Sequence, residues 1–352
     1  MFFIQWNVYY LLKCFNLKPF RQSIAQKVSV LVAVRNEEMH IKSFIFQMLQ
    51  QSYSNFELIL INDHSTDETK NIITSFNDYR IKCYDLPAHL IGKKNAIKYG
   101  LSLCNTDWVI FTDADVELKN DWLVSYINYL DNEVMVIAPV QLKIEKHRFG
   151  DVFQQLDFAA MQFITMASTI ARKAFMCNGA NMALHKNRAL NYIQTLNMAI
   201  PSGDDVFILH QHIQQGGKVY LNISPSSVVS IKPAATFKEF VLQRLRWASK
   251  AKYYKNSRAV FISWFIFIIH FYLFVGLIAS IVYHALLPWI ALFLIIKMLI
   301  DFPLFWVGQR LISMYRQWYA FYPFVSLIYF LYISTIAIVA TFSPVVWKNR
   351  KW

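Results

Sequence analysis

Two long windows without a charged side chain constrain this 352-residue chain more than any other feature. No Asp, Glu, Lys or Arg occurs in residues 259–296 or in residues 317–347. Each window exceeds the roughly 20 residues that a helix needs to cross a bilayer. The sequence therefore predicts a C-terminal membrane region with helical spans at about residues 260–283, 286–308 and 320–342.

The net charge is positive, and its distribution indicates which partners to expect. Lys and Arg number 35 against 22 Asp and Glu, a formal charge of +13. Seven basic residues precede the first apolar window, a placement typical of a cytoplasmic flank that meets anionic lipid. We therefore expect membrane lipids and no nucleic acid as partners. These residues are Lys238, Arg244, Arg246, Lys250, Lys252, Lys255 and Arg258.

The number of crossings is ambiguous in the sequence. Two crossings would keep both this basic flank and the loop with Arg310 and Arg316 in the cytoplasm. A third crossing would export the basic residues at 348, 350 and 351, so one segment could instead be re-entrant or interfacial. The middle span carries Lys297 and Asp301 one turn apart, which predicts a structural ion pair or, alternatively, an acceptor-binding role.

Residues 1–26 are apolar and aromatic, yet they lack the basic start and the cleavage site of a signal peptide. The twelve uncharged residues before Lys13 are too few to span a bilayer. Two interpretations stay open: an interfacial helix with Trp6, Tyr9 and Tyr10 at headgroup level, or a helix that packs on the protein. The four dispersed cysteines predict neither disulfides nor a zinc site, in keeping with a reducing compartment.

From residue 27 to about 140, short apolar runs alternate with amphipathic stretches. Runs that are apolar on both faces are typical of strands in a buried parallel sheet. Strands and helices that take turns predict a doubly wound α/β fold, which binds its ligands at the carboxyl ends of the strands. The predicted strands are residues 28–34, 56–62, 81–86, 108–113 and 134–140.

Acidic side chains follow two of these strands, where a buried sheet does not need them. Asp63 could accept hydrogen bonds from a nucleotide base or ribose, or it could cap a turn. Asp113 and Asp115 stand two residues apart after the fourth predicted strand, and such a pair can hold a divalent cation that bridges a diphosphate. The sequence thus indicates a metal-assisted nucleotide site at this edge of the sheet.

Three further segments contain candidate site residues. Gly92 precedes a helix that begins with Lys93 and Lys94, which suits phosphate oxygens but also describes an ordinary lysine-rich surface helix. The small residue Gly179 permits the close approach of a ligand. Ser202 and Asp205 have the spacing of a capping box, which places Asp204 and Asp205 at the start of a helix.

Seven motifs occur in an order that resembles family 2 glycosyltransferases. They are VRNEE (34–38), NDHSTD (62–67), GKKNA (92–96), DAD (113–115), FMCNGANM (175–182), GDD (203–205) and QRLRW (243–247). The closer resemblance is to the membrane subset with cellulose synthase, hyaluronan synthase and ceramide glucosyltransferase. It covers about residues 27–252 and implies a GT-A fold with inversion at the anomeric carbon.

The resemblance also implies roles for individual residues. Asp205 would be the catalytic base, and Asp113 and Asp115 would hold Mg²⁺ or Mn²⁺. His64 stands where the family usually has Gly. Residues implied at the donor are Ala33, Arg35, Glu37, Asp63, Lys93, Asp113, Gln243 and Arg246, and those implied at the acceptor are Cys177, Gly179 and Trp247.

We therefore predict four segments: 1–26 as an apolar interfacial or anchoring segment, 27–235 as a GT-A catalytic domain, 236–258 as an amphipathic interfacial helix, and 259–352 as the transmembrane region. The predicted enzyme is an inverting, metal-dependent hexosyltransferase on the cytoplasmic face of the cell membrane. It would move sugar from a nucleotide-sugar, with a UDP-sugar expected, to a lipid or lipid-linked acceptor. A processive polysaccharide synthase is the alternative, and a catalytically silent scaffold is a third interpretation. Residues 141–175 show an apolar helix without recognisable chemistry.

Overall fold

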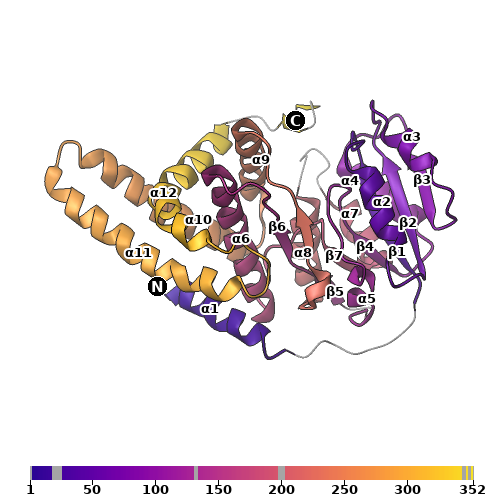
Figure 1. Ribbon diagram of the computed structural model, residues 1–352, viewed down its shortest axis with the longest axis horizontal. Coiled ribbons are helices and arrows are strands. Elements are labelled where there is room, and N and C mark those ends of the chain that lie inside the picture. The colour runs from indigo at the N-terminus through magenta and orange to yellow at the C-terminus, as the bar shows by residue number, and fades with distance from the viewer. Residues whose placement is uncertain are drawn as a thin grey trace. The chain divides into compact units, whose positions relative to one another are not determined.

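The computed structural model describes residues 2–17, 26–130, 134–196, 203–342, 346–347 and 350–351 (Figure 1). The chain divides into two compact units. Lys13–Gln141 and Ser168–Lys232 form the α/β unit, and Met1–Leu12, Leu142–Ala167 and Pro233–Trp352 form the helical unit. The four predicted segment boundaries stay predictions.

The α/β unit is built on a seven-stranded sheet with the order β3-β2-β1-β4-β7-β5-β8. Strands β3, β2, β1 and β4 run parallel to one another, whereas β7 is antiparallel to both β4 and β5. The strands are β1 Val28–Val34, β2 Phe56–Asn62, β3 Ile81–Asp85, β4 Trp108–Phe111, β5 Val134–Ile137, β7 Met182–His185 and β8 Lys218–Leu221. The predicted α/β fold is therefore confirmed, with the first two strands at their predicted bounds.

One predicted strand is wrong as a continuous element. Residues 134–140 divide into β5 and the short β6 Val140–Leu142, which pairs with β9 Val229–Ile231 in a separate sheet. The break falls at Pro139, which has no N–H to donate to a neighbouring strand. The Ala138 N–H instead donates to the Asn181 carbonyl, 3.0 Å away.

Helices cover the sheet and place polar segments at its edge. Helix α4 packs on β1 and β2, and α7 packs against α4 and α8. The described helices of this unit are α2 Ile41–Leu49, α3 Thr69–Thr74, α4 Lys93–Leu103, α5 Trp122–Ile127, α7 Lys186–Gln194, α8 Asp204–Gln214 and the 3₁₀ turn η1 Pro225–Ser227. Residue 202, half of the predicted capping box, lies outside the described residues.

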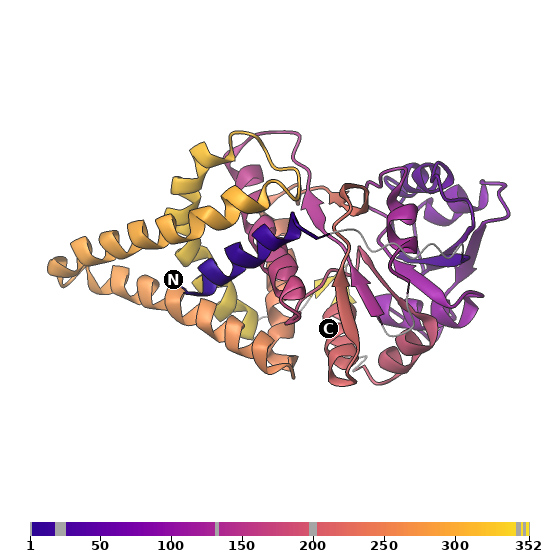
Figure 2. The same ribbon diagram turned by 90° about the horizontal axis from the view of Figure 1, so that it is seen from below.

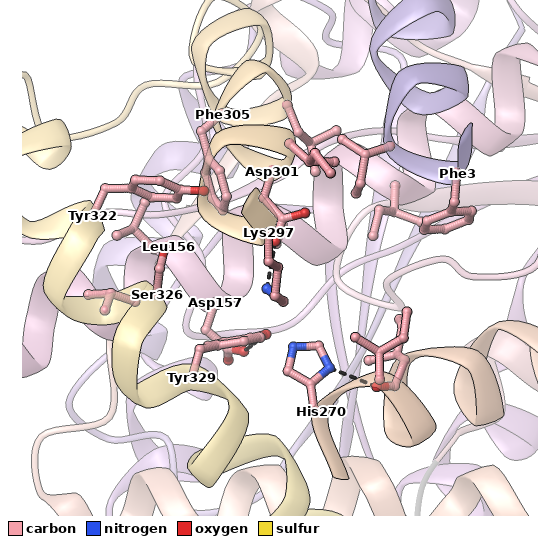
Figure 3. A pocket seen from close by; sticks show the side chains of 18 of the residues that line it. Phe3, Leu156, Asp157, His270, Lys297, Asp301, Phe305, Tyr322, Ser326 and Tyr329 are labelled. Atoms are coloured by element: carbon pink, nitrogen blue, oxygen red, sulfur yellow. Dashed lines mark hydrogen bonds and ion pairs between the residues drawn. The ribbon is translucent and has the colours of Figure 1, made fainter. Parts of the chain in front are cut away.

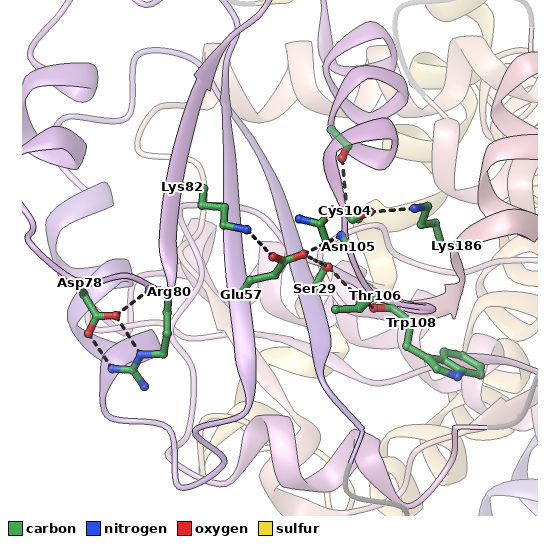
Figure 4. A network of polar contacts seen from close by, with 11 residues as sticks. Ser29, Glu57, Asp78, Arg80, Lys82, Cys104, Asn105, Thr106, Trp108 and Lys186 are labelled. Atoms are coloured by element: carbon green, nitrogen blue, oxygen red, sulfur yellow. Dashed lines mark hydrogen bonds and ion pairs between the residues drawn. The ribbon is translucent and has the colours of Figure 1, made fainter.

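A buried polar network lies near the beginning of the strands, away from their carboxyl ends (Figure 4). Glu57 is 1% exposed, pairs with Lys82 at 2.7 Å, and accepts hydrogen bonds from Ser29 Oγ and Asn105 N. Burial alone would raise the pKa of Glu57, but these donors hold the pKa below its ordinary value. The network therefore satisfies a buried charge between strands, which is a structural role.

The helical unit contains three helices that are long and apolar enough to span a membrane. They are α10 Ser257–Ala279, α11 Leu287–Gly308 and α12 Trp318–Phe342; α10 packs along α12, whereas α10 and α11 form a hairpin whose arms diverge (Figures 1 and 2). The three predicted spans are confirmed as such helices. The unit also holds most of α1 Phe2–Cys14 and α6 Phe149–Ile170, as well as α9 Phe237–Ser249, the turns η2 Lys250–Tyr253 and η3 His284–Leu286, and the strand pair β10 Val346–Trp347 and β11 Arg350–Lys351.

Two predictions about this unit have structural outcomes. Lys297 Nζ lies 2.6 Å from Asp301 Oδ2, which confirms the predicted ion pair. Helix α1 is buried at Asn7 and Leu11 and half exposed at Tyr9. It therefore packs on the protein along one side, and the membrane placement of its exposed aromatic side stays a prediction. The basic residue at 348 lies outside the described residues.

Candidate functional site

The parallel strands β1, β2 and β4 are each followed by a polar segment, and these segments lie at the carboxyl ends of the strands. Asp63 directly follows β2, whose last residue pairs with the last residue of β1, and Asp113 comes two residues after the end of β4. Arg35, just beyond β1, donates from Nη1 to the carbonyls of Asp63, at 2.8 Å, and His64, at 3.2 Å. Ala33 pairs with the β2 backbone two residues before Asp63. The carboxyl ends of these strands therefore form one continuous surface.

Asp63 links β2 to the start of α4. Its side chain is 1% exposed, and Oδ1 accepts the Gly92 N–H at 3.1 Å. Gly92 has a φ of 95°, a conformation that favours glycine. His64 also has positive φ, at 53°, in the left-handed region that non-glycine residues seldom adopt. Asp63 thus holds the loop before α4, and its predicted contact with a nucleotide base stays a prediction.

Lys93 lies at the centre of the acidic residues. Its Nζ is 2.5 Å from Asp113 Oδ1. Burial would lower the pKa of Lys93, but the carboxylates of Asp113, Asp204 and Asp205 raise it above its ordinary value. The end of β4 and the start of α8 therefore meet around one ammonium group. The next residue, Lys94, is 4% exposed and lies over the Phe207 ring, so the lysines are not an ordinary solvated helix face.

Asp115 lies at the surface of this cluster. Although part of the side chain reaches solvent, the protein packed around the carboxylate raises its pKa, and Asp113 and Glu37 raise it further. Lys93 opposes this effect, and the resulting pKa is about 6. Asp115 is therefore an acid held close to other acids, as expected of a group that receives a cation.

The first turn of α8 presents two acids in different surroundings. Asp204 is 6% exposed, whereas Asp205 is half buried. Burial raises the pKa of Asp204, Lys93 opposes the shift, and Asp205 adds to it. The two oxygens of Asp205 accept N–H groups from Val206 at 2.8 Å and Gly179 at 3.0 Å.

Gly179 lies directly against these acids. A Cβ on Gly179 would stand 3.3 Å from Asp205 Cβ, so the predicted close approach occurs, although toward a carboxylate. Thr112 Oγ1, at the end of β4, donates to the Ala180 carbonyl at 2.8 Å. The loop before β7 is therefore tied both to β4 and to α8. Cys177 is half buried in the same loop.

Asn181 was not predicted as a site residue, although it lies in the FMCNGANM motif. Its side chain is fully buried, and Oδ1 accepts from Trp122 Nε1 at 3.0 Å and Tyr126 Oη at 2.7 Å. Its Nδ2 donates to the carbonyls of Pro139, at 2.7 Å, and Ser227, at 2.8 Å. The amide oxygen and the amide nitrogen of Asn181 thus make two hydrogen bonds each, and these bonds position the loop that carries Gly179.

The QRLRW residues lie on α9 in the helical unit. Gln243, Arg246 and Trp247 are half buried, and Gln243 Oε1 accepts a hydrogen bond from Arg244 Nη1. Arg244 is 5% exposed and pairs with Asp157 at 2.6 Å, and its guanidinium lies 4.3 Å from the Trp247 ring centroid. The predicted donor and acceptor roles stay predictions, whereas the structure gives Arg244 a packing role that the sequence did not indicate.

The carboxylates that follow β4 suit a divalent cation that is held partly by the protein and partly by a diphosphate. Within the ranges that the structure describes, no three His, Cys, Asp or Glu side chains gather closely enough to hold a metal. Asp113 and Asp115 are therefore a partial site. Mg²⁺ is commonly bound by one or two carboxylates together with substrate phosphates and water. The residues fit such a metal once a phosphate ligand is present.

Comparisons with known proteins show which proteins this chain resembles. Residues 29–190 match the family model described as Glycosyl transferase family 2. An uncharacterized glycosyltransferase of Haemophilus influenzae is 35% identical over 113 residues, 32% of this chain and 45% of that protein. UDP-Glc:alpha-D-GlcNAc-diphosphoundecaprenol beta-1,3-glucosyltransferase WfaP of Escherichia coli is 28% identical over 119 residues, 34% of this chain and 47% of that protein. The chain thus spans less than half the length of these curated relatives.

Among solved structures, the mannosyltransferase PcManGT from Pyrobaculum calidifontis, in complex with GDP-Man and Mn²⁺, has a TM-score of 0.53. The two chains are 17% identical, and the match covers 94% of this chain and 96% of the other. The fold is that of a GT-A glycosyltransferase domain followed by C-terminal helices, three of which are long and apolar. Residues 29–190 carry the likeness to glycosyltransferase family 2.

Proposed function

We propose that the chain transfers a sugar from a nucleoside-diphosphate sugar to a hydroxyl acceptor. The observation that carries the proposal is the cluster in which Lys93 meets Asp113, Asp204 and Asp205 at the carboxyl ends of the strands. Relatives named as glycosyltransferases, one for UDP-Glc, and a structure bound to GDP-Man support a nucleotide-sugar donor.

The charge of the cluster supports a requirement for a divalent cation. The five acids of the cluster and its immediate surroundings outnumber the two bases, so an anionic diphosphate would be repelled unless a cation accompanies it. Asp113 and Asp115 would hold Mg²⁺ or Mn²⁺, which would supply positive charge to the leaving diphosphate. The acids are Glu37, Asp113, Asp115, Asp204 and Asp205, and the bases are Lys93 and Lys94.

The chain's own residues would perform the remaining steps. Lys93 would keep a positive charge beside the diphosphate, and the backbone around Gly92 would position α4 beneath it. Asp205 would take the proton from the acceptor hydroxyl as that oxygen attacks the anomeric carbon. Attack opposite the departing diphosphate gives inversion, as the resemblance implies.

The function is tested by incubating the detergent-purified full chain with UDP-, GDP- and TDP-sugars and a membrane lipid extract. Release of the nucleoside diphosphate with transfer of label to lipid supports the proposal. The absence of both turnover and donor hydrolysis with every sugar would favour the silent scaffold. Transfer that yields long polymer chains would support the processive synthase instead.

Asp115 gives a prediction about metal binding. Asp115→Ala should abolish Mn²⁺-dependent turnover, because one carboxylate is too few to hold the ion with the diphosphate. In the wild type, Mn²⁺ affinity in the presence of a UDP-sugar should be constant above about pH 7. Because the Asp115 pKa is raised to about 6, protons compete below that pH, and affinity should fall up to about tenfold per pH unit. Manganese titration followed by electron paramagnetic resonance measures both effects.

Asp107→Ala is the matched control, since Asp107 stands at the other end of β4. It should leave Mn²⁺ affinity unchanged. Turnover that survives Asp115→Ala and excess EDTA would remove the metal from the mechanism.

We further propose that the α/β unit faces the cytoplasm at the cell membrane and acts on a lipid or lipid-linked acceptor. The three apolar helices and the basic flank before α10 support this, as does the diphosphoundecaprenol named for one relative's substrate. Protease added to intact spheroplasts should leave the α/β unit uncut, and permeabilised cells should show cleavage. Cleavage in intact spheroplasts would reverse the orientation.

A further inference from the structure

A cavity of about 340 Å³ lies within the helical unit, between α1, α6, α10, α11 and α12 (Figure 3). This volume is in the usual range of small-molecule pockets, about 300–1,000 Å³. Its wall is mostly apolar, from side chains such as Phe265, Ile269, Phe293, Ile296, Ile300 and Leu304. Such a wall suits a hydrocarbon chain.

The polar groups of this cavity neutralise one another in pairs. Lys297 is bound to Asp301 at 2.6 Å, and Asp157 is bound to Arg244 at 2.6 Å. Asp157 also accepts from Tyr329 Oη at 2.8 Å. Among the described lining residues, each Lys or Asp thus has an oppositely charged partner. A phosphate would have to break an existing pair, so the cavity favours a neutral ligand.

One polar atom in the wall lacks a partner. His270 is 6% exposed, and its Nδ1 donates to the Ile266 carbonyl at 2.7 Å. With the proton on Nδ1, Nε2 is an acceptor, and no described group donates to it. Figure 3 shows this nitrogen turned toward Lys297 and Tyr329, and the imidazole packs edge-on to Tyr329 at 5.6 Å. A buried acceptor without a donor is costly, so the site calls for a ligand hydroxyl.

We propose that this cavity binds the apolar chain of a neutral lipid that carries a hydroxyl group, and that the hydroxyl donates to His270 Nε2. A wholly apolar ligand would leave His270 Nε2 without a donor. An anionic head group would find no unpaired positive charge among the described lining residues, because Lys297 is already paired with Asp301. The further step that this lipid class is also the sugar acceptor rests on the proposed function.

The test uses the purified full chain in nanodiscs and three 16-carbon probes with a diazirine in the chain: the alcohol, its methyl ether and the alkyl phosphate. The wild type should bind the alcohol about three- to tenfold more tightly than the ether, the worth of one hydrogen bond. His270→Leu should lose this preference. His270→Gln, which retains an acceptor oxygen, should keep part of it, and this also guards against simple misfolding.

His284→Leu is the matched control. His284 Nδ1 bonds to the carbonyl four residues earlier, as His270 does, but His284 does not line the cavity. It should therefore retain the preference for the alcohol. Tighter binding of the phosphate, or equal labelling by all three probes in the wild type, would overturn the proposal. Because no sugar donor is present, failure here is distinct from failure of nucleotide-sugar turnover.

Discussion

Replacement of Asp205 by Asn should lower turnover at least about a hundredfold while leaving donor binding nearly intact. Asn keeps the shape of the side chain and can still accept the N–H of Gly179 or Val206 through its oxygen. It cannot take a proton from an acceptor hydroxyl. General-base assistance contributes about 10²–10⁴ in rate, which sets the size of the loss. Steady-state turnover and donor affinity by calorimetry measure the two effects separately.

Asp204→Asn is the comparison that makes this prediction sharp. Adjacent residues on a helix point about 100° apart, and here Asp204 is buried whereas Asp205 is half buried. Asp204→Asn would remove only a favourable interaction of a negative charge with the helix N-terminus. It should therefore cost far less turnover than Asp205→Asn, which removes the base. If Asp204→Asn is the inactive variant and Asp205→Asn is active, the roles of the two acids are exchanged.

The fold of the α/β unit was readable because its signals are local. Apolar runs such as β1 and β2 are buried on both faces, and their bounds agree with the sequence prediction. The prediction failed at Pro139, where a single missing N–H divides an apolar run that hydrophobicity alone joins. The antiparallel direction of β7 was not predicted, because strand direction depends on long-range pairing rather than on local pattern.

Some of the predicted site residues of the α/β unit contact one another, whereas others do not. Lys93 and Asp113 are in contact, and Gly179 contacts Asp205. Asp63 is instead buried against Gly92, which matches the turn-holding alternative that the sequence left open. Asn181 escaped prediction because its role depends on four partners far apart in the sequence. A motif can indicate that such a residue matters, but only the fold shows what it holds.

In the helical unit, too, the sequence did not indicate the partners of a buried polar residue. Residues 141–175 suggested an apolar helix without chemistry, yet Asp157 within it is 3% exposed and joins α6 to α9 and α12. An acid inside an apolar helix is a signal that could have been used, since such a charge needs a partner. The identity of that partner, Arg244, could not be deduced, because QRLRW contains two arginines.

Asp157→Ala should lower the free energy of unfolding of the helical unit by about 3–5 kcal/mol, the usual cost of breaking a buried ion pair from one side. The Arg244 guanidinium would keep its ring contacts with Phe240 and Trp247, but its positive charge would stay buried without a carboxylate. Tyr329 would also lose its acceptor. Denaturant titration of the full chain in detergent, followed by tryptophan fluorescence, measures the change.

Two variants separate the charge from the packing. Asp151→Asn, in the first turn of the same helix, removes a favourable helix-terminal charge and should cost no more than about 1 kcal/mol. The double variant Asp157→Leu with Arg244→Met removes both charges together, and it should recover much of the stability because neither group is left unpaired. A double variant as unstable as Asp157→Ala would show that α9 depends on the shape of Arg244 against Phe240 and Trp247. The cost would then come from lost ring contacts rather than from an orphaned charge.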